Sequence, residues 1–98
     1  MEITTTRDGA SLSLALAGRL DTGTSPQLEA ELADSLEGVT SLVIDLAALD
    51  YISSAGLRVL LATQKKMNKQ GTMTITNVCE SVMEVFEMTG FSDILTIE

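Results

Sequence analysis

Residues 49–61 read Leu-Asp-Tyr-Ile-Ser-Ser-Ala-Gly-Leu-Arg-Val-Leu-Leu, and this pattern marks the passage from a strand into a helix. The expected strand covers residues 42–46, and a short link leads from it to two adjacent serines. Ser53 is placed to cap the helix, because its hydroxyl oxygen can accept a free N–H of the first turn. Ser54 is then the first helical residue, beside unpaired N–H groups and the positive end of the helix dipole.

The segments around this junction alternate between strand and helix patterns. Leu42-Val43-Ile44 is a continuous apolar run, which predicts a central strand covered on both faces. Thr24 or Ser25 is placed to cap an earlier helix, and Gly38 is placed to end it. The expected elements are strands at 3–7 and 12–16, a helix at 26–37, a strand at 42–46, a helix at 54–69, a strand at 73–76, a helix at 80–89 and a last strand or extended tail at 94–97.

This order, strand-strand-helix-strand-helix-strand-helix-strand, is typical of the α/β class. A chain of 98 residues buries enough surface for one core, and its sequence contains no linker and no internal repeat. We therefore expect one domain over residues 1–98, an α/β sandwich with a mixed β-sheet.

The composition excludes several classes of function. The chain has 14 acidic and 6 basic residues, a net charge of -8, which repels nucleic acid and anionic membranes and favours a protein partner. It contains no histidine, the commonest general base and metal ligand, so we expect no metal, no cofactor and no Ser-His catalytic pair. Cys79 is the only cysteine, and no secretory signal or membrane-spanning run is visible. We expect a cytoplasmic monomer.

Three interpretations of the two serines are open. Ser53 and Ser54 can simply cap the helix. A nucleophilic Ser54 is disfavoured, because a hydrolase elbow needs glycine where Ile52 stands, and no histidine can act as base. A phosphate on Ser54 is favoured by the helix N-terminus and can pair with Arg58, four residues later. Asp21, after an earlier strand, either bonds its own turn or points into the same surface.

Four motifs, taken in order, resemble those of STAS domains. They are Gly18-Arg19-Leu20-Asp21, Leu42-Val43-Ile44-Asp45-Leu46, Ile52-Ser53-Ser54-Ala55-Gly56-Leu57 and the segment 89–95. The resemblance extends over essentially the whole chain, and a free-standing chain of this length is similar to the bacterial anti-sigma-factor antagonists. It implies a mixed sheet with helices packed mainly on one face, and a protein that is not an enzyme.

The resemblance also implies a partner switch. In this family the unmodified antagonist binds an anti-sigma factor, which is also a serine kinase of the histidine-kinase-like ATPase fold, and so releases the sigma factor. The kinase phosphorylates the serine two residues before the motif glycine, here Ser54, and a PP2C-type phosphatase restores binding. Ser53 stands where many members carry aspartate, so a carboxylate role is in doubt there. The partner-binding residues implied are Asp21, Ser53, Ala55, Gly56, Leu57 and Arg58.

Two rival functions are compatible with parts of this pattern. STAS domains also serve as non-catalytic subunits of lipid ABC transporters, where the serine-bearing surface docks on the membrane component without a kinase. A small enzyme or nucleotide-binding module is disfavoured, because the sequence has no histidine, no phosphate-binding glycine loop and no convincing pair of metal ligands.

Overall fold

The computed structural model describes all of residues 1–98 and contains one four-stranded sheet. Strands β1 and β2 are antiparallel, whereas the β2–β3 and β3–β4 pairs are parallel, and the spatial order is β1-β2-β3-β4. The mixed α/β architecture expected from the sequence is confirmed. In chain order the elements are β1 (Glu2–Asp8), β2 (Ser11–Leu20), α1 (Ser25–Ser35), β3 (Ser41–Ile52), α2 (Ser54–Met67), β4 (Thr72–Thr76), α3 (Glu80–Thr89) and the 3₁₀ helix η1 (Phe91–Asp93).

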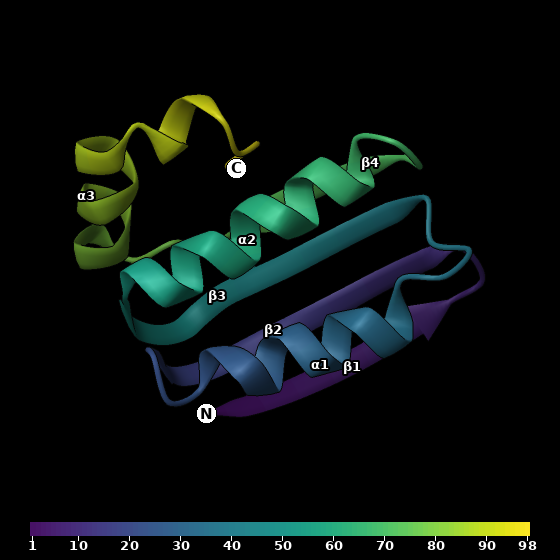
Figure 1. Ribbon diagram of the computed structural model, residues 1–98, viewed down its shortest axis with the longest axis horizontal. Coiled ribbons are helices and arrows are strands. Elements are labelled where there is room, and N and C mark those ends of the chain that lie inside the picture. The colour runs from purple at the N-terminus through teal and green to yellow at the C-terminus, as the bar shows by residue number, and fades with distance from the viewer.

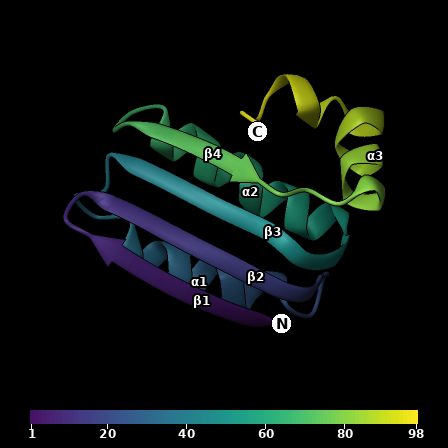
Figure 2. The ribbon, with the colours of Figure 1, turned by 180° about the vertical axis from the view of Figure 1, so that it is seen from behind.

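Helices α1 and α2 lie side by side on one face of the sheet (Figure 1). Figure 2 shows the opposite face without a helix over it, and α3 at one end of the sheet, where its Val82 and Phe86 are buried in the core. The core consists of 22 buried apolar residues, and leucines at alternate positions of β2 and β3 supply its sheet side. Burial of this layer supplies the main force that holds α1 and α2 against the sheet. None of the helices combines the length and apolar character needed to cross a membrane.

Strand β3 differs from the expected segment 42–46 in length and in burial. It runs on to Ile52, because two irregularities in its pairing with β2 each place an extra residue in β3. Leu42 and Ile44 are buried, but Val43 between them is only half-buried. The prediction of a strand covered on both faces is therefore wrong. Buried and less buried residues do alternate along this strand, but the sequence does not show it, because the residue on the open face, Val43, is also apolar.

The end of the chain forms the extended tail rather than a full strand. Ile97 makes one isolated parallel bridge with Ile75 of β4. The Ile75 N–H donates to the Thr96 carbonyl at 2.8 Å, and the Glu98 N–H donates to the Ile75 carbonyl at 2.9 Å. The last expected strand is thus reduced to a single bridge at the free edge of β4.

Helix α1 is held at its C-terminal end by Arg7 of β1. The guanidinium donates to the carbonyls of Ser35 at 3.2 Å, Glu37 at 3.1 Å and Gly9 at 3.0 Å. The last turn of α1 has no basic residue of its own, so Arg7 supplies the positive charge that complements the helix dipole. The helix ends at Ser35 with Leu36 as its C-cap, two residues earlier than expected, and Gly38, with φ of +78°, turns the chain toward β3.

Candidate functional site

Helix α2 begins at Ser54, and Ser53 is its N-cap, as the sequence predicts. Ser53 has an extended backbone, with φ of -101° and ψ of 174°, and its hydroxyl oxygen accepts the Gly56 N–H at 3.5 Å. Ser54 is exposed, and the first turn of α2 contains no acidic residue. The positive end of this helix dipole is therefore not neutralised beside the Ser54 hydroxyl.

The loop after β2 lies against this helix start. The Ser53 N–H donates to the Leu20 carbonyl at 2.8 Å, which joins the carboxyl ends of the two parallel strands β2 and β3. Gly56 is buried beside Leu20, and a Cβ atom on Gly56 would come within 2.7 Å of Leu20 Cγ. The glycine thus permits the close approach of α2 to β2. The structure brings the Asp21 loop and the serines together, which the sequence alone left open.

Asp21 organises the loop between β2 and α1. Its Oδ1 accepts the N–H groups of Gly23 and Thr24, each at 3.0 Å, and its Oδ2 lies 3.8 Å from Nε of Arg19. The backbone N–H of Thr24 is the main cause that lowers the pKa of the Asp21 carboxyl below its ordinary value. The carboxylate therefore bonds its own turn, which is one of the two alternatives derived from the sequence.

The start of α1 is built differently from the expected side-chain cap. Thr24 is the N-cap residue but makes no side-chain cap bond, because its hydroxyl donates to the Arg19 carbonyl at 2.7 Å. The Ser25 hydroxyl donates to the Asp21 carbonyl at 2.6 Å. The predicted N-cap position at Thr24 is confirmed, but the side-chain cap bond is absent, since the hydroxyls of Thr24 and Ser25 both bond backward into the loop.

Arg19 and Tyr51 form a pair that sequence reasoning missed. They are register partners on β2 and β3, and the Arg19 guanidinium carbon lies 4.1 Å from the centre of the Tyr51 ring. Arg19 also pairs with Asp21, so the stacked ring helps to fix the cation that faces the loop. The irregular register of β3 creates this pairing, and no local sequence signal indicates it.

Asp45 and Cys79 lie outside this surface, and neither belongs to a group of side chains that could bind a metal ion. Asp45 Oδ1 accepts the Ala47 N–H at 2.9 Å and the Asn77 side-chain amide at 3.2 Å. Cys79 is the N-cap residue of α3, and its contact with the Ser81 hydroxyl is the main cause that lowers the pKa of its thiol. The structure contains no group of three or more Cys, Asp or Glu side chains that could hold a metal ion.

The residues implied by the motif fall into two classes of exposure. Gly56 and Leu57 are buried and belong to the packing under α2, whereas Ala55 is half-buried. Ser54 and Arg58 are exposed, one helical turn apart on the same side of α2. Only the exposed pair and its half-buried neighbours therefore present side-chain atoms to an approaching molecule.

Comparison with known proteins shows which family this sequence belongs to. The family model named STAS domain matches residues 2–98. The chain belongs to the STAS domain family.

Relatives of this STAS domain carry names from one functional group. It is 39% identical over 99 residues to BtrV of Bordetella bronchiseptica, a candidate anti-sigma factor antagonist, covering 99% of this chain and 85% of BtrV. It is 32% identical over 87 residues to the anti-sigma-B factor antagonist of Bacillus subtilis, covering 88% of this chain and 80% of that protein.

Solved structures confirm the STAS fold. An anti-sigma factor antagonist from Mycobacterium paratuberculosis superposes with a TM-score of 0.87 at 24% identity, covering 98% of this chain and 83% of that one. The Bacillus antagonist SpoIIAA in its phosphorylated form superposes with a TM-score of 0.77 at 17% identity, covering 99% and 91%. The expectation of helices packed mainly on one face of a mixed sheet is thereby confirmed.

Proposed function

We propose that this STAS domain is an anti-sigma factor antagonist in a partner-switching pathway. Its unmodified form binds an anti-sigma factor, which is also a serine kinase of the histidine-kinase-like ATPase fold, and so frees the target of that protein. Phosphorylation of Ser54 abolishes the binding. A PP2C-type phosphatase removes the phosphate and restores it.

The setting of Ser54 carries this proposal. Its side chain is exposed on the first residue of a 14-residue helix whose first turn has no acid. A phosphate adds about 1.5–2 negative charges at pH 7, and the N–H groups of a helix N-terminus stabilise such an anion. Modification there leaves the fold intact and changes the charge and shape of the outer surface, as a switch requires.

The residues around Ser54 divide into contacts and supports. Ser53, Ala55 and Arg58 surround the hydroxyl on the outer surface of α2, and we assign them to direct contact with the partner. Arg58 is also the cation nearest in the helix to pair with a phosphate on Ser54. The residues that hold this surface in place from below or from the neighbouring loop are Gly56, Leu57 and Asp21.

The switch requires only a modest change in the free energy of binding. A tenfold loss of affinity needs about 1.4 kcal/mol. A doubly charged group introduced at the centre of an interface exceeds this value when it meets an apolar or acidic surface. The net charge of -8 means that the phosphate adds to an existing negative field.

Affinity capture from the native organism tests the proposal. Unmodified protein and the variants Ser54→Ala and Ser54→Asp serve as paired baits, and mass spectrometry identifies the retained proteins. Ser81→Asp is the matched control, because Ser81 is exposed in the first turn of α3 and the same charge is added there. We expect an ATPase-kinase on the unmodified, Ser54→Ala and Ser81→Asp baits, and its loss on Ser54→Asp.

Two results would contradict this function. Equal recovery of the ATPase on Ser54→Ala and Ser54→Asp removes the switch. Recovery of the same transporter subunits on every bait, without an ATPase-kinase, identifies instead the non-catalytic subunit of a lipid ABC transporter. In that case Ser54 is only the first residue of a capped helix.

A further inference from the structure

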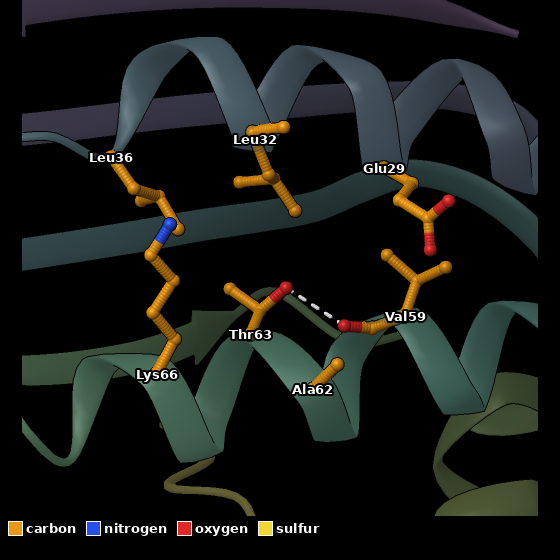
Figure 3. A pocket seen from close by; sticks show the side chains of 8 residues that line it. Glu29, Leu32, Leu36, Val59, Ala62, Thr63 and Lys66 are labelled. Carbon is orange, nitrogen blue, oxygen red and sulfur yellow. Dashed lines mark hydrogen bonds between the residues drawn. The ribbon is translucent and has the colours of Figure 1, made fainter.

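A groove runs between α1 and α2 on the helical face of the molecule (Figure 3). One section, a cavity of about 160 Å³, has the buried side chains of Leu32, Leu36 and Val59 among its lining residues. Ala33 of α1 and Ala62 of α2 are exposed members of the same lining. Because both wall residues are small, the groove is open to side chains from outside over its apolar floor.

The groove continues to the amino end of α2. A second section of about 420 Å³ shares Glu29 and Ala62 with the first and also includes Ala55 and Arg58. The groove therefore begins beside Ser54 and is continuous with the surface assigned above to partner binding.

The α2 wall of the groove is basic. Helix α2 carries three of the six basic residues of the chain and no acidic residue. None of the three forms an ion pair, since the only salt bridge joins Arg19 to Asp21. Two of them, Arg58 and Lys66, line the groove, and Figure 3 shows the Lys66 side chain extending from α2 across the groove toward Leu36.

We propose that this groove receives an acidic amphipathic helix of the partner kinase. The inference rests on the proposed function and adds the part of the kinase that is recognised. A helix is the fitting occupant because it satisfies its own backbone groups, whereas an extended peptide would leave N–H and C=O groups unpaired against the apolar floor. A third helix laid between two parallel neighbours also packs by ridges into grooves.

The spacing of the basic residues sets the pattern of the occupant. Arg58 and Lys66 are eight residues apart on one helix, which is about 12 Å along its axis. An apolar side chain of the occupant enters between Ala33 and Ala62, and an acidic side chain one turn to either side reaches Arg58 or Lys66. The recognised helix therefore carries an acidic residue, an apolar residue four positions later and a second acidic residue four positions after that.

A second copy of this chain does not fit the groove. Each copy carries a net charge of -8, so two copies repel one another. Glu29 lines the groove on its α1 side, so the acidic side chains of the occupant lie against the opposite wall, beside Arg58 and Lys66 of α2. The complementary surface therefore belongs to a different protein.

The test uses the ATPase-kinase recovered by the unmodified protein, purified and titrated by calorimetry. Lys66→Glu reverses a charge in the groove, and Lys65→Glu makes the same change on the adjacent residue outside it. Ala33→Met fills the groove from α1, and Ala30→Met adds the same side chain on the exposed face of that helix. We expect both groove variants to weaken binding about 10-fold or more, and both controls to stay within about 2-fold. Far-ultraviolet circular dichroism and thermal melting establish that all four variants are folded.

Zero-length carbodiimide cross-linking supplies a second readout. It joins the Lys66 amine directly to a carboxylate of the kinase, and mass spectrometry identifies the acidic residue. We expect an acid on an amphipathic helix with the spacing given above. A cross-link to a loop or strand, or none in a complex that forms, overturns the inference.

The outcomes separate this inference from the proposed function. If both groove variants bind like the unmodified protein while Ser54→Asp does not, the groove inference fails and the switch stands. If the groove variants lose binding and Ser54→Asp retains it, the groove is the docking site and the switch fails. If no ATPase-kinase is recovered by the unmodified protein, both are overturned.

Discussion

Replacing Gly56 by alanine is expected to destabilise the protein, although alanine is the better helix former. The added Cβ would lie 2.7 Å from Leu20 Cγ and 3.0 Å from Ile52 Cγ1, both in the core. Glycine-to-alanine exchange within a helix contributes about 1 kcal/mol of stability, whereas overpacking of a core costs about 1–3 kcal/mol. The expected net effect is a loss of up to about 2 kcal/mol.

A double-mutant cycle with Leu20 gives the sharpest form of this prediction. Leu20→Ala alone is expected to cost about 2–5 kcal/mol, because Leu20 is fully buried and a cavity remains. In that background the Cβ of Gly56→Ala enters vacated space on the Leu20 side and keeps only the 3.0 Å approach to Ile52 Cγ1, so its helix-forming gain is opposed much less. Gly56→Ala then becomes neutral or stabilising, and the coupling between the two sites lies in the range of about 0.5–3 kcal/mol.

Urea denaturation followed by circular dichroism measures the four free energies of unfolding, with unchanged slopes as the check on two-state behaviour. If Gly56→Ala stabilises the otherwise unmodified protein by the full helix-propensity gain, its Cβ does not clash with Leu20 and the prediction is refuted. Additivity of the two substitutions within about 0.5 kcal/mol would equally show that the Leu20 contact does not constrain this glycine.

Three further predictions concern the frame around the site. Arg7→Ala is expected to lower the free energy of unfolding by about 1–2 kcal/mol, because it removes two carbonyl contacts at the end of α1 and one in the turn between β1 and β2. Arg7→Lys should restore only part of this stability, and an unchanged urea midpoint would refute the prediction. For Asp21, whose pKa is lowered by the Thr24 N–H, the carboxylate stabilises the fold fully above its ordinary pKa of 3.8, and this contribution is lost as pH falls through the lower folded value. The stability difference between the unmodified protein and Asp21→Asn should therefore shrink between pH 7 and about pH 2 in urea titrations, and a constant difference would contradict it. Gly71→Ala would drive a Cβ into the Thr40 carbonyl oxygen, so the free energy of unfolding measured by calorimetry should fall by more than about 3 kcal/mol. An unchanged melting temperature would show that the backbone can move to relieve this contact.

The local features of the fold could be predicted from the sequence because short-range chemistry determines them. The Ser53 cap and the start of α2 at Ser54 follow from side-chain hydrogen bonding in one turn. The hairpin follows from Asp8-Gly9, where Gly9 has a φ of +63°. The mixed sheet follows from the order of the elements, since strands separated by helices pair in parallel.

Contacts between distant segments could not be predicted in the same way. The capping of α1 by Arg7 and the packing of Leu20 against Gly56 both depend on how strands and helices pair in space. The half-buried state of Val43 depends on a sheet face that lacks a covering helix. The motif likewise gave no means to separate the exposed Arg58 from the buried Leu57, because both lie in the first two turns of α2.

Phosphate mapping after incubation with the recovered ATPase-kinase and ATP tests the central claim most directly. We predict a single phosphate on Ser54, no phosphate on Ser54→Ala, and loss of calorimetric binding between the isolated phosphorylated protein and the kinase. A phosphate on another residue such as Ser53, or a Ser54-phosphorylated protein that binds the kinase as tightly as the unmodified one, would contradict the account.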